Sequence, residues 1–163
     1  MSTSGAAHNK RRTGPVRGQG SVAEGQGRNH LLMIVLRVLI GVGLIVSAVI
    51  HLQLASGFQQ AAPAGIGGGA LFRIQAVVSI LAAAYVLIRG SRAAFAIAAI
   101  VALSALAAVV LYRYVQVPAI GPIPSMYEPV WYPQKALTAV AEAFAGTLAV
   151  IGYVLLLRRR NDM

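Results

Sequence analysis

Hydrophobic residues gather into four long stretches that are separated by shorter, more polar segments. A helix needs about 20 mostly apolar residues to cross the hydrocarbon core of a bilayer, and each stretch has about that length. The stretches cover residues 31–50, 70–88, 93–112 and 136–157. The pattern therefore predicts an all-α protein, a four-helix transmembrane bundle, with residues 31–157 forming one membrane domain.

The segments before and after these stretches have a different composition. Residues 1–30 are rich in Gly, Ser, Asn, Gln and Arg and contain few apolar side chains. Such a segment buries too little apolar surface to offset the entropy lost on ordering. We therefore predict a disordered basic tail over residues 1–30 and a short second tail over residues 158–163.

Overall composition excludes an ordinary water-soluble domain. Hydrophobic residues make up 58% of the 163-residue chain and charged residues only 11%, whereas soluble domains carry about 25% charged residues. The partner that this composition predicts is the lipid bilayer. The net charge of +10 could by itself suggest a nucleic-acid partner, but the placement of the basic residues argues against one.

The basic residues lie mainly on one side of the membrane if the chain crosses it four times. Eleven of the fourteen Lys and Arg residues fall in the N-terminal tail, early in the first stretch, in the turn at 89–92 and after the last stretch. Short segments rich in Lys and Arg stay in the cytoplasm. We therefore predict a multi-pass protein of the cytoplasmic (inner) membrane. Both termini are then cytoplasmic, and the loops at 51–69 and 113–135 face outward.

The second of these loops is stiff and aromatic. It holds five of the seven prolines of the chain, and proline restricts the backbone. Trp and Tyr side chains prefer the membrane–water interface. We expect this loop to cap the outer surface, with a lid over a site as the alternative role. The predicted interface anchors are Tyr127, Trp131 and Tyr132.

The chain lacks the usual residue sets for catalysis. It contains no cysteine, which excludes disulfides, thiolate nucleophiles and Cys-ligated metal centres. The sequence also shows no Ser–His–Asp arrangement, paired carboxylates or His-x-x-x-His motif. We therefore predict no catalytic residues and no cofactor, and the sequence does not favour an enzyme.

Glu142 is the acidic residue that lies inside a predicted span. A carboxylate facing lipid would be unpaired, so the side chain should face the interior of the bundle. Helical spacing places small or weakly polar residues on one face of every span, where they allow close helix contact. These residues are Gly43, Ser47 and His51 in the first span, Phe72, Gln75 and Ser79 in the second, Ser104, Ala108 and Tyr112 in the third, and Thr138, Glu142, Gly146 and Ala149 in the fourth.

The predicted topology brings several polar residues to the outer third of the membrane. The expected cluster contains His51, Gln75 and Glu142, with Arg73 and Tyr112 nearby. In one interpretation, Glu142 pairs with Arg73 or His51 and locks the bundle, because buried charges need partners. In another, His51 and Glu142 change protonation state or bind a ligand. A metal site is not predicted, since one imidazole and one carboxylate are too few ligands.

Short motifs resemble a known group of membrane proteins. The sequence Ile50-His51-Leu52-Gln53-Leu54, followed after a loop by Leu71-Phe72-Arg73-Ile74-Gln75, is similar to an H-L-x-L…L-F-x-x-Q pattern. That pattern occurs in small four-helix integral membrane proteins of actinobacteria. The layout, with Arg37 early in the first span, also resembles DoxX-like proteins. The resemblance implies a four-helix fold and a membrane redox role, although the absence of cysteine argues against thiol chemistry.

Three functions follow from these observations as hypotheses. The first is a non-catalytic accessory or scaffold subunit that associates with a membrane-protein partner or with further copies of itself. The second is a small transporter, or a ligand- or proton-binding membrane protein, that uses the outer polar cluster. The third, which depends on the resemblance, is a DoxX-like membrane redox component.

Overall fold

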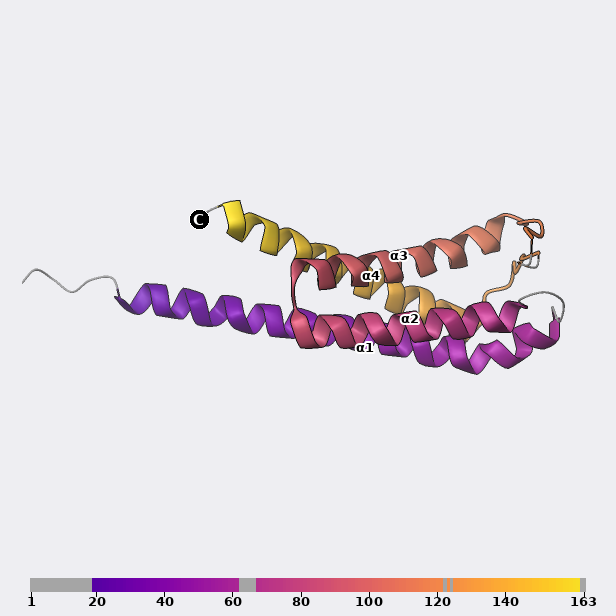
Figure 1. Ribbon diagram of the computed structural model, residues 1–163, viewed down its shortest axis with the longest axis horizontal. Coiled ribbons are helices and arrows are strands. Elements are labelled where there is room, and N and C mark those ends of the chain that lie inside the picture. Colours follow the sequence, from indigo (N-terminus) through magenta and orange to yellow (C-terminus); the bar gives the residue numbers. More distant parts are fainter. Residues whose placement is uncertain (1–18, 62–66, 122, 124, 162–163) are drawn as a thin grey trace, which may run out of the picture.

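Four helices make up the fold in the computed structural model (Figure 1). The structure describes residues 19–61, 67–121, 123 and 125–161. All four helices are long and apolar enough to cross a membrane, which confirms the predicted all-α architecture of four potential spans. Their bounds are α1 Gln19–Ala61, α2 Gly68–Arg89, α3 Arg92–Tyr114 and α4 Pro133–Asn161.

Helix α1 is longer at both ends than the predicted span at 31–50. It begins at Gln19 and ends at Ala61, so the expected loop at 51–69 is wrong for residues 51–61. Residues 19–30 of the predicted basic tail belong to α1, while residues 1–18 lie outside the described part of the chain. Once a helix has nucleated, each added residue gains a backbone hydrogen bond, so a helix can continue past the end of the apolar stretch.

Contacts with α2 stabilise the added outer part of α1. Ala55 is buried, and a Cβ atom on Gly69 would overlap its carbonyl oxygen. The rings of Phe58 and Phe72 stack with their centroids 4.2 Å apart. The glycine near the start of α2 thus permits a backbone approach that extends the α1–α2 pair beyond the hydrophobic stretch.

A two-residue turn joins α2 and α3. Gly90 adopts a left-handed conformation with φ of 53° and donates its N–H to Val86 O at 3.1 Å. Ser91 then caps the next helix, since its hydroxyl oxygen accepts a hydrogen bond from the N–H of Ala94. Such a short connection makes α2 and α3 antiparallel neighbours.

Arg37 secures the same end of the bundle from α1. Its Nε donates to Val86 O at 3.0 Å, and its guanidinium also contacts Leu87 O. The last carbonyls of a helix have no partners within that helix, and a cation there is favoured by the helix dipole. Arg37 is therefore a side-chain cap for α2.

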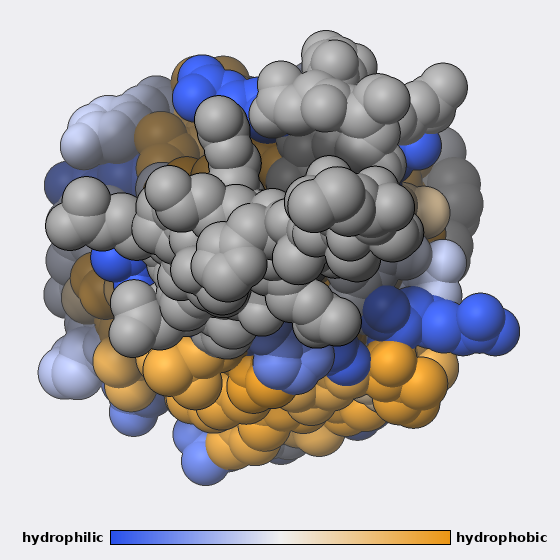
Figure 2. Space-filling view, turned by 90° about the vertical axis from the view of Figure 1, so that its left-hand side faces the viewer, coloured by the Kyte–Doolittle hydropathy of each residue, from blue (hydrophilic) through white to orange (hydrophobic). Residues whose placement is uncertain are grey.

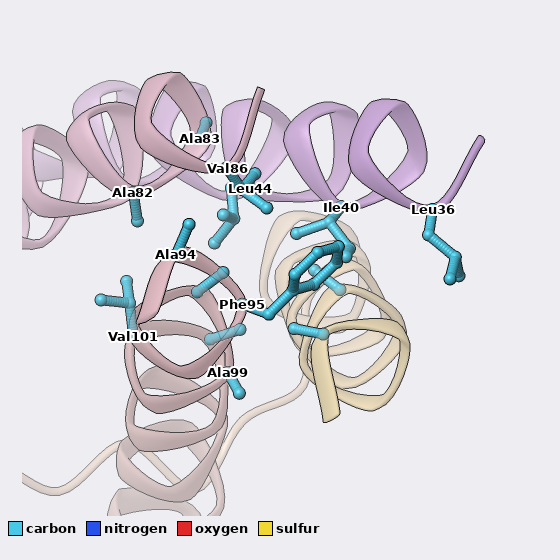
Figure 3. Close-up of a cluster of buried hydrophobic side chains, with 14 of the residues drawn as sticks. Leu36, Ile40, Leu44, Ala82, Ala83, Val86, Ala94, Phe95, Ala99 and Val101 are labelled. Atoms are coloured by element: carbon cyan, nitrogen blue, oxygen red, sulfur yellow. The ribbon is translucent and has the colours of Figure 1, made fainter. Parts of the chain in front are cut away.

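Small residues allow the helices to pack closely in the core (Figure 3). Phe95 of α3 is fully buried, and a Cβ atom on Gly152 of α4 would overlap its ring. A Cβ on Gly43 would come within 3.0 Å of the Cβ of Ala145, which marks a second close approach between α1 and α4. Around Phe95 lie mainly alanines with a few larger aliphatic side chains.

Large aliphatic side chains cover the outside of the bundle. Leu81, Ile88 and Ile100 are all more than 60% exposed. The end-on view shows hydrophobic residues reaching the surface of the molecule (Figure 2). An exposed apolar surface of this kind is suited to lipid contact, and the four apolar helices are consistent with a multi-pass membrane protein.

The connection between α3 and α4 folds back on itself. Backbone hydrogen bonds pair Val117 with Met126 and Ile120 with Ile123, and Glu128 N–H donates to Tyr112 O at 2.9 Å. This segment lies at the end of the bundle formed by the last turn of α3 and the start of α4 (Figure 1).

The three predicted interface anchors differ in exposure. Tyr127 and Trp131 are exposed, whereas Tyr132 is partly buried. The hydroxyl of Tyr132 donates a hydrogen bond to the carboxylate of Glu128 at 3.3 Å. Anchoring at the interface stays a prediction for all three, and Tyr132 has an additional contact within the protein.

Candidate functional site

Glu142 points into the bundle and is 1% exposed. Ser47 of α1 donates a hydrogen bond from Oγ to Glu142 Oε1 at 2.8 Å. His51, one turn further along α1, places Nδ1 4.0 Å from the same oxygen. The structure therefore brings together the imidazole and the carboxylate from helices far apart in sequence.

The hydrogen bonds of His51 define which ring nitrogen is free. Nδ1 lies 2.8 Å from Ser47 O and 3.3 Å from Ser47 Oγ. A backbone carbonyl can only accept, so Nδ1 carries the hydrogen in this contact. In the neutral ring Nε2 is then an acceptor, on the side of the imidazole away from the Ser47 carbonyl.

Two buried polar atoms next to this pair have no hydrogen-bond partner. They are Thr138 Oγ1 and Glu142 Oε2. Thr138 precedes Glu142 by four residues, so both side chains share one face of α4. Buried polar atoms in proteins are nearly always paired, and two orphan oxygens on the same face indicate room for a missing donor.

A cavity of about 610 Å³ opens beside this group. Ligand pockets usually have volumes of about 300–1,000 Å³. Most of the wall is aliphatic or aromatic, and it includes residues from all four helices and the α3–α4 connection. We call three polar lining residues, His51, Gln75 and Thr138, the cavity floor.

The predicted site residues fall into two groups. His51, Gln75 and Tyr112 line the cavity, and Glu142 is bonded to Ser47 behind it. Gln75 donates from Nε2 to Ser79 Oγ at 3.3 Å, which leaves its Oε1 as an acceptor. Arg73, in contrast, is exposed, and in the described part of the chain it belongs to no ion pair. The partner of Glu142 is thus on α1 rather than Arg73.

A second polar group at the mouth of the cavity was not among the predicted site residues. Lys135 is only 5% exposed, and its Nζ lies 3.8 Å from Glu128 Oε2. It also donates to the Glu128 carbonyl. Burial, together with the nearby Glu128 carboxylate, raises the pKa of the Tyr132 hydroxyl. That hydroxyl therefore stays protonated and can donate to Glu128 over the whole physiological range.

Ser47 and Thr138 were also absent from the predicted site, although both lay on the predicted interior faces. Their helical spacing to His51 and Glu142, four residues in each case, was the available signal. Lys135 lies in α4, three residues before Thr138, and this helical spacing was its available signal. For Glu128 no comparable signal exists, because it lies in the irregular α3–α4 connection, whose path is not set by periodicity. Among the described residues, no three His, Cys, Asp or Glu side chains gather as a metal site would require.

Comparison of the chain with family models, curated proteins and solved structures gives no match. The resemblance to actinobacterial four-helix and DoxX-like proteins therefore stays a prediction from short motifs.

Proposed function

We propose that the protein is a multi-pass membrane protein that binds a small ligand in the cavity between its helices. The observation that carries this proposal is the Thr138 hydroxyl, which is buried, lacks a partner and lines a cavity of about 610 Å³. An unpaired buried polar atom costs about 1–3 kcal/mol. A ligand that pairs with it recovers part of this free energy.

The cavity favours ligand binding over the first hypothesis from the sequence. An accessory or scaffold subunit needs an outer surface that fits its partner, and nothing in that role requires an internal space lined by the unpaired hydroxyl of Thr138. The accessory role stays a prediction. The exposed apolar surface of the helices supports contact with lipid.

We expect a bulky side chain in the cavity to weaken ligand binding. Ala108 lines the cavity, whereas Ala107 beside it is exposed on the outside of α3. Ala108→Phe should weaken binding of phenyl-bearing probes by about tenfold or more, equivalent to about 1.4 kcal/mol, because the ring occupies the site. The probes are 4-phenylbutanol, 4-phenylbutylamine and 4-phenylbutyrate, titrated into protein in nanodiscs.

The emission of Trp131, the single tryptophan of the chain, provides the signal, because its ring centroid lies 5.6 Å from Nζ of Lys135, which lines the cavity. Ala107→Phe is the matched control and should leave every dissociation constant within about twofold, as expected for a surface change. If no probe gives saturable binding to the unmodified protein, or if both variants behave alike, ligand binding in this cavity is wrong.

We further propose that the protein lies in the cytoplasmic membrane with both termini in the cytoplasm. Support comes from the basic residues at one end of the bundle, where Arg89 and Arg92 flank the α2–α3 turn and Arg158 closes the last span. Lys and Arg in short loops favour the cytoplasmic side. The cavity mouth would then face outward.

Labelling of introduced cysteines tests this orientation without background, since the natural chain has none. Ala119 in the α3–α4 connection and Ala93 at the start of α3 are both exposed. In intact cells, a membrane-impermeant maleimide should modify Ala119→Cys and spare Ala93→Cys. Permeabilised cells should show both labelled. The reverse pattern in intact cells would show that the termini lie outside.

A further inference from the structure

Each residue of the cavity floor offers a hydrogen-bond acceptor. His51 uses its Nδ1 hydrogen on Ser47, which leaves Nε2 as an acceptor. Gln75 uses one of its two amide hydrogens on Ser79, and its carbonyl Oε1 is an acceptor. Thr138 adds a hydroxyl oxygen without a partner. A ligand group that donates hydrogen bonds can therefore pair with all three residues of the floor.

Glu142 places a buried carboxyl group behind these acceptors, and it is not among the residues that line the cavity. One of its oxygens is bonded to Ser47, and the other has no partner. The Nδ1 of His51 is 4.0 Å away, but its hydrogen is directed to the Ser47 carbonyl. Buried carboxylates need a compensating charge or donors, and the described helices supply one neutral hydroxyl for this purpose.

We propose that the ligand of this cavity carries a protonated amine at its inner end and an apolar, preferably aromatic, body. This inference rests on the proposed function. An ammonium group has three donors and no acceptor, which matches the floor, and its charge complements Glu142. Aromatic faces also attract cations, and the Phe72 ring lies 5.2 Å from that of His51 on the cavity wall.

Lys135, the cation at the mouth of the cavity, does not favour an anionic ligand. Lys135 already has the Glu128 carboxylate at 3.8 Å and the Glu128 carbonyl as partners. An anionic ligand would have to displace Glu128 and would meet the acceptors of the floor. Arg113 lies near Lys135, but it is not among the residues that line the cavity. The two ends of the cavity therefore differ in charge. At the mouth, Lys135 is paired with Glu128, whereas among the described residues the carboxyl group of Glu142 near the floor has no Lys or Arg partner.

The same three probes test this inference, because they share one body and differ only in the terminal group. At neutral pH, 4-phenylbutylamine should bind the unmodified protein at least about tenfold more tightly than 4-phenylbutanol, and 4-phenylbutyrate should bind weakest. Glu142→Gln keeps the size and the Ser47 acceptor but removes the charge. In this variant the ratio of the dissociation constants of 4-phenylbutanol and 4-phenylbutylamine should fall to about twofold, while the affinity for 4-phenylbutanol stays unchanged.

Thr138→Val provides an independent variant, which keeps the side-chain shape and removes the orphan oxygen. It should weaken the amine and the alcohol alike, since both donate to that oxygen. If the unmodified protein binds the carboxylate or the alcohol as tightly as the amine, the amine inference is wrong while ligand binding in the cavity stands. If none of the three binds saturably, the proposed function itself is wrong. The comparison in the unmodified protein decides the inference even if Glu142→Gln does not fold.

Discussion

Replacing Phe95 with alanine should lower the free energy of unfolding of the bundle by about 3–5 kcal/mol, the usual cost of removing a buried aromatic side chain. Phe95 is 0% exposed and lies where α3 meets α1 and α4 (Figure 3). Gly152 of α4 leaves room for the Phe95 ring, because a Cβ atom at this position would overlap the ring. In lipid, helix association depends on such packing rather than on transfer from water, so the lost contacts have no substitute.

Phe144→Ala is the matched control for this prediction. Phe144 is 48% exposed on the outside of α4, and its removal should change the free energy of unfolding by less than about 1 kcal/mol. Reversible unfolding in mixed micelles, followed by circular dichroism, measures both variants. Equal losses of stability would contradict the placement of Phe95 at the centre of helix packing.

Most of the fold was predictable because bilayer thickness imposes a length on each apolar stretch. The turn at 89–92 was equally predictable, since a connection of two residues between long helices forces them into an antiparallel hairpin. The ends of α1 were not predictable in the same manner. Hydropathy marks where lipid contact ends, whereas a helix ends where its backbone hydrogen bonds end. Residues 51–61 remain helical because Ala55 and Phe58 pack on α2.

The candidate site was predictable to the extent that helical spacing controls it. Periodicity placed His51 and Glu142 on interior faces, and the order of the helices placed them at a similar depth. It did not reveal that Ser47 is the direct partner of Glu142, because a pattern gives the face of a residue but not the rotation of facing helices. Arg73 failed as a predicted partner for a different reason, which helical periodicity itself contains. It lies two residues before Gln75, which turns it by about 200° around α2 at 3.6 residues per turn.

Ser47→Ala should be strongly destabilising by itself but nearly harmless in combination with a change at Glu142. The single variant leaves Glu142 Oε1 buried without its 2.8 Å donor, and we expect a loss of about 2–3 kcal/mol in the free energy of unfolding, since hydrogen bonds to charged groups contribute that much. Ser47→Ala combined with Glu142→Leu should recover most of the loss, because apolar replacement of both partners removes the unpaired group. Unfolding in mixed micelles measures the coupling, and Ser104→Ala, whose hydroxyl bonds within its own helix, is the control.

This double-mutant cycle also separates the two interpretations of Glu142 that the sequence left open. If the carboxylate serves only to lock α1 to α4, Glu142→Leu should be as destabilising as Ser47→Ala, and probe binding should follow stability alone. If it serves a ligand, the double variant should be stable and yet lose its preference for 4-phenylbutylamine over 4-phenylbutanol. A stable double variant that still prefers the amine would show that the negative charge of Glu142 has no part in recognition. The Thr138 hydroxyl, which the cycle leaves in place, would then be the better candidate for the contact that positions the ligand.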